Sequence, residues 1–103
     1  MTKYLLAYKG GSIPASEQEQ KAAMAAWGQW FGSLGTAVVD GGNPFGRSRA
    51  VAATGSRGDG ASALTGYSVL QAESLEAAAS LAAGCPILKN GGTGDVYETI
   101  NVM

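Results

Sequence analysis

The strongest constraint on the fold is a helix that the sequence marks both at its start and along its length. Ser16 and Glu19 have the spacing of a capping box, in which the serine hydroxyl accepts from a first-turn amide and the glutamate reaches back to the cap. Behind this box, apolar residues fall on one helical stripe: Ala23, Trp27, Trp30, Phe31 and Leu34. The pattern predicts an amphipathic helix that ends near residues 32–35, with both tryptophans in the core or in the wall of a pocket.

The segments on either side of this helix have the composition of strands. Residues 4–8 form a short, nearly continuous apolar run, which suits a central strand. After the helix, residues 37–39 indicate a second strand that runs into turn-forming residues, and residues 64–71 indicate a stronger one. Between them, residues 49–53 form a weaker strand pattern, and the glycine-rich stretch 55–60 is a hairpin or loop.

A second helix and a last strand complete the pattern. Ser74 is placed to cap a helix over residues 75–82, which Gly84 and Pro86 terminate. Residues 96–103 then alternate between two sets of side chains, as a strand does. The order is β-α-β-β-α-β, so we predict one α+β domain over residues 1–103 with a ferredoxin-like fold and both helices on one face of an antiparallel sheet.

This arrangement leaves the second face of the sheet uncovered. Tyr67 or Tyr97 would lie on that face, and a large exposed apolar surface is unusual for a monomer. The composition agrees, because only 15% of the residues are charged while 46% are hydrophobic, which is a sparse polar surface for a small domain. We therefore expect a homodimer in which two copies pack sheet against sheet.

The charged and metal-binding residues exclude several classes of function. Seven basic and eight acidic residues are spread along the chain, with a net charge of −1, so the chain lacks the basic surface that nucleic acid or an anionic membrane would need. It has no histidine and a single cysteine, Cys85, which leaves neither an internal disulfide nor a zinc ligand set, and we expect no metal and no cofactor. The single cysteine and the lack of a signal-peptide pattern favour a cytoplasmic protein.

Asp40, Arg47 and Arg49 are the charged candidates for a site. Asp40 follows the second strand, where a carboxylate can lean over a cleft and act as a general base, or can be an ordinary turn residue that bonds the amides of its own loop. Arg47 and Arg49 are two residues apart, so on an extended segment both would face one way and grip a carboxylate. The alternative for the arginines is a pair of solvated charges at a sheet edge.

Tyr8 and Tyr67 are the polar aromatic candidates. Both lie on predicted strands, as does Tyr97, and a phenol can orient a ligand oxygen or can simply pack at the interface between two sheets. Glu98 interrupts the apolar side of the last strand, either as a functional carboxylate or at the edge of the dimer contact. Cys85 has no histidine to activate it, so we expect no nucleophilic role.

Five segments that together cover most of the chain carry a resemblance to a known family. In order they read KYLLAY, MAAWGQWFGSLG, VVDGGNPFG, LTGYSVLQAESLEAAASLAAGCP and GGTGDVYETINVM. With this order and spacing they resemble the YCII-related family, which includes the DGPF proteins. The resemblance implies a ferredoxin-like fold that dimerises as an α/β barrel, with a cleft between the sheet and the loop after the second strand. It also implies muconate-type acids as one class of substrate, because a few relatives act on them.

Two features depart from the pattern of that family. The DGPF tetrapeptide that names one branch is not intact, since the corresponding loop reads Gly58-Asp59-Gly60-Ala61-Ser62. Some relatives also pair a histidine on the first helix with an aspartate, and that pair cannot be transferred to a chain without histidine. Any catalysis here would have to use Asp40, a tyrosine or an arginine.

These observations lead to one expected function and two alternatives. We expect a homodimer that binds a small organic acid in a cleft near the loop after the second strand, with Arg47, Arg49, Tyr8 and Tyr67 as ligand-binding candidates. The first alternative is a cofactor-free isomerase or lyase in which Asp40 moves a proton. The second alternative is a purely structural dimer whose cleft has no ligand.

Overall fold

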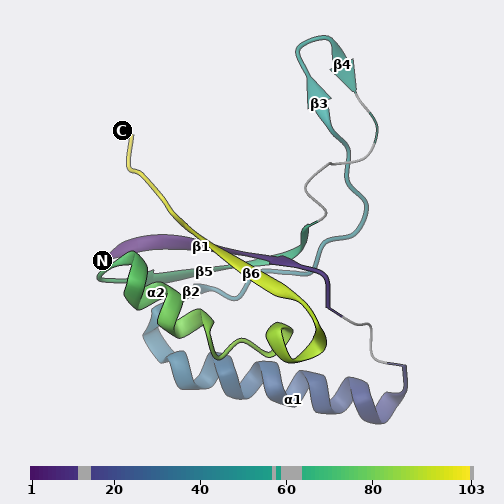
Figure 1. Ribbon diagram of the computed structural model, residues 1–103, viewed down its shortest axis with the longest axis vertical. Helices are drawn as coiled ribbons and strands as arrows, with labels where there is room; N and C mark the ends of the chain where they lie inside the picture. The colour runs from purple at the N-terminus through teal and green to yellow at the C-terminus, as the bar shows by residue number, and fades with distance from the viewer. Residues whose placement is uncertain (12–14, 57, 59–63, 103) are drawn as a thin grey trace.

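Four strands form one antiparallel sheet, and two helices pack against it (Figure 1). The computed structural model describes residues 1–11, 15–56, 58 and 64–102. Across the sheet the strand order is β2-β5-β1-β6, and every neighbouring pair is antiparallel. Along the chain these strands and the helices follow one another as β-α-β-β-α-β. The predicted α+β class is therefore confirmed.

The two central strands of the sheet are the longest. The four strands are β1 (Thr2–Lys9), β2 (Val38–Asp40), β5 (Leu64–Ala72) and β6 (Thr93–Glu98). β1 lies between β5 and β6, and it contains the apolar run at residues 4–8. A strand with partners on both sides has little exposed surface, so it tolerates such a run.

Both helices begin at the serine that the sequence predicted as a cap. The Ser16 hydroxyl accepts a hydrogen bond of 3.1 Å from the Glu19 amide at the start of α1 (Glu17–Leu34). The Ser74 hydroxyl accepts one of 3.0 Å from the Ala77 amide at the start of α2 (Leu75–Ala82). Each helix is followed by a short 3-10 helix, η1 (Gly35–Ala37) after α1 and η2 (Pro86–Asn90) after α2.

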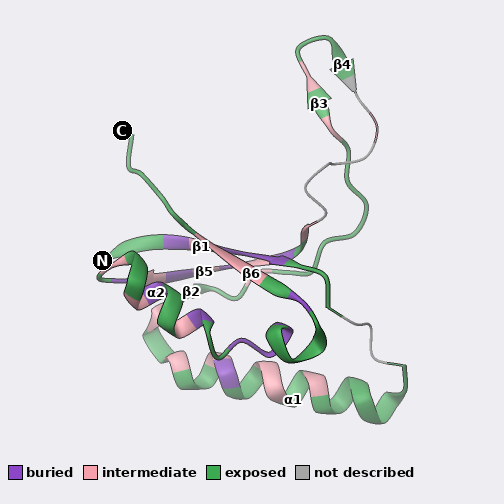
Figure 2. Ribbon diagram, in the orientation of Figure 1, coloured by how far each residue is buried: buried purple, intermediate pink, exposed green. Residues whose placement is uncertain are grey.

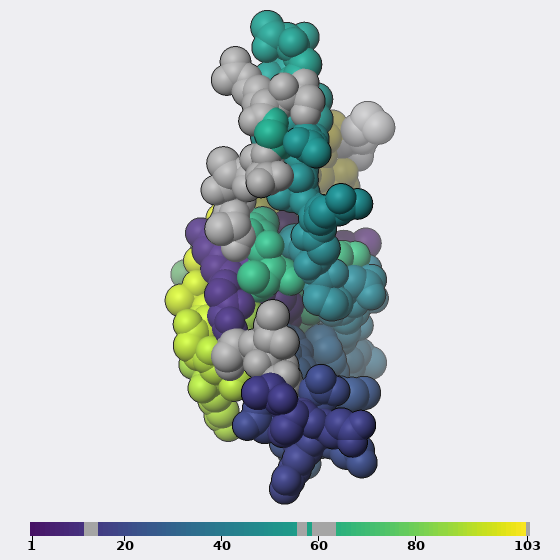
Figure 3. All heavy atoms as spheres, turned by 90° about the vertical axis from the view of Figure 1, so that its right-hand side faces the viewer, coloured from purple at the N-terminus to yellow at the C-terminus, as the bar shows by residue number. Residues whose placement is uncertain are grey.

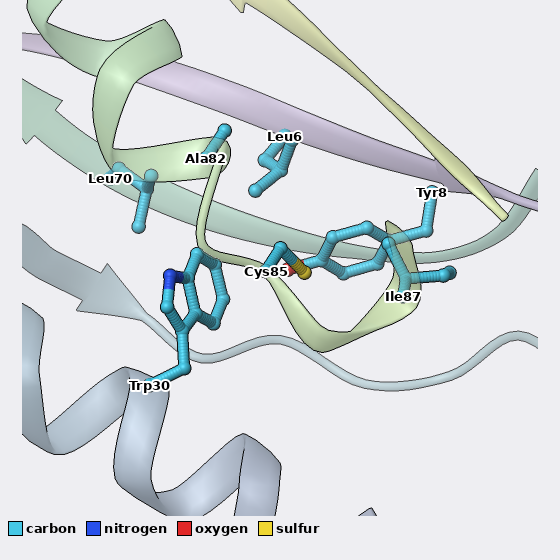
Figure 4. Close-up of a cluster of buried hydrophobic side chains, with 7 residues drawn as sticks. All are labelled: Leu6, Tyr8, Trp30, Leu70, Ala82, Cys85 and Ile87. Carbon is cyan, nitrogen blue, oxygen red and sulfur yellow. The ribbon is translucent and has the colours of Figure 1, made fainter. Parts of the chain in front are cut away.

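The core lies between the sheet and the two helices (Figure 2). Its larger cluster joins β1, β5, both helices and η2 through Leu6, Tyr8, Trp30, Leu70, Ala82, Cys85 and Ile87 (Figure 4). A smaller cluster consists of Tyr4, Ala72 and Ala78. The residues that β1 and β5 contribute to these clusters all have even numbers, because alternate side chains of a strand point to one face. Both helices therefore cover the same face of the sheet.

The opposite face of the sheet carries no helix in the described part of the chain. Leu5 lies opposite Val69 on one side and Tyr97 on the other, so these side chains form a row across three strands. Phe45, from the loop after β2, stacks on Tyr67 with 5.7 Å between ring centres. Phe45 and Tyr97 are 47% and 53% exposed. We call these five residues the open face.

Residues 46–56 leave the body of the protein as an arm (Figures 1 and 3). At its end β3 (Val51–Ala52) pairs with β4 (Gly55–Ser56) in a ladder separate from the main sheet. The weak strand predicted at residues 49–53 is thus two residues long, and of the loop predicted at 55–60, residues 57, 59 and 60 lie outside the described residues. The radius of gyration is 15.1 Å, compared with about 13 Å for a compact chain of this length.

The last strand begins and ends earlier than predicted. The alternation predicted a strand over residues 96–103, whereas β6 spans Thr93–Glu98 and residue 103 lies outside the described residues. The Thr99 amide still donates to the Lys3 carbonyl at 3.1 Å, but β1 begins at Thr2, so no partner strand remains beyond that point. Residues 99–102, the C-terminal segment, are exposed and outside any helix or strand.

Candidate functional site

A cleft of about 660 Å³ opens between α1 and the end of the sheet at which the chain leaves β2. Its walls come from residues of α1, from the loop 41–44, from residues 65–67 of β5, and from Tyr8 and Ile87. Among the described residues, no side chain that lines the cleft carries a charge. The cleft is therefore an apolar space with a few neutral polar groups, which is the usual character of a small-molecule site.

Aromatic side chains of α1 form one wall of this cleft. The Trp27 ring lies 5.3 Å from the Tyr8 ring, nearly perpendicular to it, and 5.9 Å from the Phe31 ring. Behind them Trp30 is buried, and its indole N–H donates to the Leu81 carbonyl at 3.1 Å. The indole N–H of Trp27 has no hydrogen-bond partner within the described residues. Trp30 thus serves the core, while Trp27 belongs to the cleft.

The loop after β2 forms the floor of the cleft and lies close against β5. Gly42 has a φ of 75°, and a Cβ at this position would collide with the Tyr67 carbonyl. The Phe45 amide donates to the Thr65 carbonyl at 2.9 Å, which fixes the far end of the loop on the same strand. Glycine at position 42 therefore lets the loop approach the strand more closely than any larger residue would.

The Tyr8 hydroxyl connects the cleft wall to the core. It lies 2.7 Å from Ser68 Oγ, and Ser68 Oγ donates to the Gly41 carbonyl at 2.7 Å. Because the single hydroxyl proton of Ser68 points toward Gly41, Tyr8 is the donor in the first bond. Burial raises the pKa of Tyr8, which outweighs the lowering by its bond to Ser68. Tyr8 is therefore a neutral donor and a poor base.

Cys85 lies beside the Tyr8 hydroxyl in the larger core cluster (Figure 4). Burial raises the pKa of its thiol, and this outweighs the lowering by a hydrogen bond from the Ile87 backbone. A buried thiol that keeps its proton is a poor nucleophile. Its contribution here is to pack the core behind the cleft.

Asp40, Arg47 and Arg49 do not line the cleft. Asp40 Oδ1 accepts a hydrogen bond of 2.9 Å from the Gly42 amide, which is the turn arrangement that was the alternative to a general base. Arg47 and Arg49 are exposed on the arm, which leads away from the body of the protein. Of the five candidate residues, only Tyr8 and Tyr67 meet at the cleft.

Tyr67 contributes to two surfaces at once. Its neighbours Gly66 and Ser68 are buried toward the helices, so the alternation of the strand places the Tyr67 ring on the open face, where Phe45 stacks on it. Its backbone is the part that lies against the loop at Gly42. Glu98 ends β6 opposite Tyr4, is exposed, and does not line the cleft.

The cleft also uses residues that the sequence reasoning did not select as site residues. They are chiefly Gln20, Met24, Asn43, Thr65 and Ile87. Met24 is notable because it is apolar and yet 74% exposed. A signal was present, since Gln20, Met24 and Trp27 follow one another at spacings of four and three on one edge of α1. Nothing in the sequence shows, however, which loop faces that edge.

Comparison of the chain with protein-family models, with curated proteins and with solved structures found no match. No helix among the described residues is long and apolar enough to cross a membrane. The same residues contain no group of three or more histidine, cysteine or acidic side chains placed to hold a metal ion. The geometry of the cleft and of the open face is therefore the ground on which a function can be argued.

Proposed function

We propose that this protein is a homodimer that binds a small molecule in the cleft between α1 and the loop after β2. The single observation that carries the proposal is the cleft itself, about 660 Å³ in volume and walled by aromatic side chains, with Met24 exposed at its edge. A space of this size accommodates a drug-sized ligand. An exposed methionine beside aromatic rings gains from contact with such a ligand, because that contact removes apolar surface from water.

The ligand in this proposal is mainly apolar, with a neutral polar group. The side chains able to meet that group are the amides of Gln20 and Asn43 and the indole of Trp27. The organic acid expected from Arg47 and Arg49 is the alternative ligand. It has less support, because no cation among the described residues lines the cleft, and a carboxylate would lose its hydration there without a partner.

A thermal-shift experiment with matched probes tests this proposal. The probes are benzamide with benzoate and 2-naphthamide with 2-naphthoate, so each pair differs in charge and not in ring. A probe present at 100 times its Kd stabilises the folded state by about 2.7 kcal/mol, which raises the Tm of a domain of this size by several degrees. We expect the amides to raise the Tm more than the acids. A larger shift with the acids would support the organic-acid alternative.

The variant Ala23→Phe, with Ala22→Phe as its control, shows whether a probe binds in the cleft. Ala23 lines the cleft, whereas Ala22 is the preceding residue of α1, is exposed and does not line it. A phenyl group at position 23 should fill the space and remove the shift caused by the probe. The same group at position 22 should leave that shift unchanged. Equal Tm shifts in both variants would show that the probe does not bind in the cleft. That result, or no Tm shift with any probe, would favour the purely structural dimer, whose cleft has no ligand.

The homodimer in this proposal is the ferredoxin-like, YCII-related α/β barrel, in which the sheets of two copies face each other. The strand order β2-β5-β1-β6 with both helices on one face supports it, and so does the open face. Sedimentation of the wild-type protein tests it, with Tyr97→Lys on the open face and Leu88→Lys on η2 as a matched pair, since both residues are about half exposed. We expect Tyr97→Lys to give monomers and Leu88→Lys to remain dimeric. A wild-type monomer at micromolar concentration would contradict the proposal.

A cytoplasmic location is the last part of the proposal. It is supported by the single cysteine, which is buried and unpaired, so that an oxidising compartment would offer this chain no stabilising disulfide. Cell fractionation tests this location, and recovery of the protein in an extracytoplasmic fraction would contradict it.

A further inference from the structure

We infer that the arm of each copy reaches across the dimer and packs on the other copy, where it flanks the open face together with the C-terminal segment. This inference rests on the proposed homodimer. The crossing arm is an additional feature of that homodimer, because two sheets can pack face to face without any contact from the arm. The open face is then covered by a second copy of this chain.

The strand pairing of the arm is short among the residues that the structure describes. Its ladder consists of two residue pairs, Val51 with Ser56 and Ala52 with Gly55, and the Ala50 amide also donates to the Gly58 carbonyl. Val51, the largest apolar side chain of the arm, is 78% exposed. An isolated two-stranded hairpin is marginally stable in water, so an ordered arm needs another surface to pack on.

The arm and the C-terminal segment, which both carry exposed apolar residues, lie on the same side of the sheet. In Figure 1 the arm and the C-terminal segment both extend away from the helices, on the side of the open face. The C-terminal segment carries Ile100 and Val102, which are 79% and 86% exposed. The arm and the C-terminal segment therefore stand on either side of the open face (Figure 1). A second copy seated on that face would cover all of these surfaces at once.

The charges of the arm also fit a second copy. Arg47 and Arg49 are the charged residues of the arm, and no salt bridge joins either of them to another described residue. Two aspartates face away from the helices: Asp95 is already paired with Lys9 at 3.2 Å, whereas Asp40, opposite Val69, joins no salt bridge among the described residues. In a two-fold dimer in which the arm of one copy reaches Asp40 of the other, the reciprocal contact forms as well, so a second copy can pair both charges.

Mixed dimers test this inference directly. One copy carries a nitroxide spin label at Thr54→Cys, in the turn of the arm, and the other copy is unlabelled by nitroxide and enriched in ¹⁵N. We expect the amide signals of Leu5, Val69 and Tyr97 of the enriched copy to broaden. The native Cys85 is buried, so wild-type protein taken through the labelling reaction is the control. Broadening of these signals only when the nitroxide and the ¹⁵N share one chain would overturn the inference.

A pair of variants gives a second measurement that does not need a label. Val51→Asp places a charge on the arm, and Met24→Asp places one on α1, on the helix side of the sheet; the two residues are 78% and 74% exposed, so neither substitution disturbs the core. We expect Val51→Asp to raise the dimer Kd about tenfold or more, and Met24→Asp to leave it unchanged. Equal Kd values for Val51→Asp and wild type would overturn the inference.

These outcomes separate the inference from the proposal on which it rests. If the protein is dimeric, but no signal broadens between copies and Val51→Asp has no effect on the dimer Kd, the homodimer is supported and the crossing arm is rejected. If the wild-type protein sediments as a monomer, both are rejected. A dimer that Val51→Asp weakens and Tyr97→Lys leaves intact would place the contact on the arm alone, which contradicts a partner seated on the open face.

Discussion

The hydroxyl oxygens of Tyr8 and Ser68 lie 2.7 Å apart in the interior of the protein, where both residues are almost fully buried. Tyr8 donates to Ser68, and Ser68 donates to the Gly41 carbonyl at 2.7 Å. Two hydrogen bonds thus join β1, β5 and the loop that forms the floor of the cleft. The loop is thus tied to two buried side chains of the sheet.

Removing the Ser68 hydroxyl, which lies between Tyr8 and Gly41, should lower the free energy of unfolding more than removing the Tyr8 hydroxyl. Ser68→Ala leaves the buried Tyr8 hydroxyl without its acceptor and also removes the bond to the partly buried Gly41 carbonyl, so we expect a loss of about 2–3 kcal/mol in the free energy of unfolding. Tyr8→Phe leaves the bond from Ser68 to Gly41 in place, and we expect a loss of about 1 kcal/mol. Urea unfolding measures both values. Equal losses would mean that Ser68 does not bridge the two groups.

The stability of the protein should fall at alkaline pH. Burial raises the pKa of Tyr8 and of Cys85, so the folded state holds both protons after the unfolded chain has released its own. Stability is therefore complete below the unfolded pKa values, about 8.5 for cysteine and 10 for tyrosine, and is lost above them. Each group contributes a slope of up to about 1.4 kcal/mol per pH unit between its unfolded and folded pKa values.

Urea unfolding between pH 7 and 11 measures this slope, and Tyr8→Phe is the variant that isolates the tyrosine. We expect the variant to lose stability less steeply than wild type above pH 10, because it lacks the buried phenol. The two proteins differ in no other ionisable group, so every other contribution cancels in the comparison. Parallel curves above pH 10 would contradict the assignment of the effect to Tyr8.

Substitution by alanine should destabilise the protein at Gly42 and stabilise it at Gly32. Gly42 has a positive φ, and a Cβ there would collide with the Tyr67 carbonyl, so we expect Gly42→Ala to lose about 3 kcal/mol or more. Gly32 lies in α1, and a Cβ there would meet nothing within 4 Å. We expect Gly32→Ala to gain roughly 0.5–1 kcal/mol. Thermal unfolding of the two variants gives the sign of each effect, and a stable Gly42→Ala would show that the loop is not held against β5.

The cap of α2 should contribute measurably to stability. Ser74→Ala removes the hydroxyl that accepts from the Ala77 amide, so we expect a loss of about 1 kcal/mol. Ser80→Ala is the matched control, because Ser80 is exposed inside the same helix, where alanine is the better helix former. Thermal unfolding of both variants measures the difference. A loss in Ser80→Ala as large as that in Ser74→Ala would contradict a specific role for the cap.

Local signals in the sequence predicted the helices well and the edges of the sheet less well. Ser16 and Ser74 determine where the helices start through bonds to residues three positions away, so neighbouring residues suffice for the prediction. The last strand was misplaced because its alternation continues to residue 103, while its pairing ends with β1. A strand needs a partner, and the length of the partner is not visible in the segment itself.

The candidate site was predictable only in part for the same reason. Tyr8 was selected because a phenol on a predicted strand can orient a ligand oxygen, and it does line the cleft. Asp40 was selected by its place after a strand, a pattern shared by catalytic and turn residues, and its bond to the Gly42 amide identifies it as a turn residue here. Nothing near Ile87 in the sequence indicates that it meets α1 across the cleft.

Residue types and short spacings were enough to predict the two capped helices, the apolar central strand and the α+β class, and to exclude histidine chemistry. The packing of whole elements was needed to show that α1 and the loop after β2 enclose a cleft whose described lining is uncharged, that Arg47 and Arg49 stand away from it on an arm, and that one face of the sheet is open. Those features depend on contacts between residues far apart in the chain, and such contacts are set by how whole elements pack.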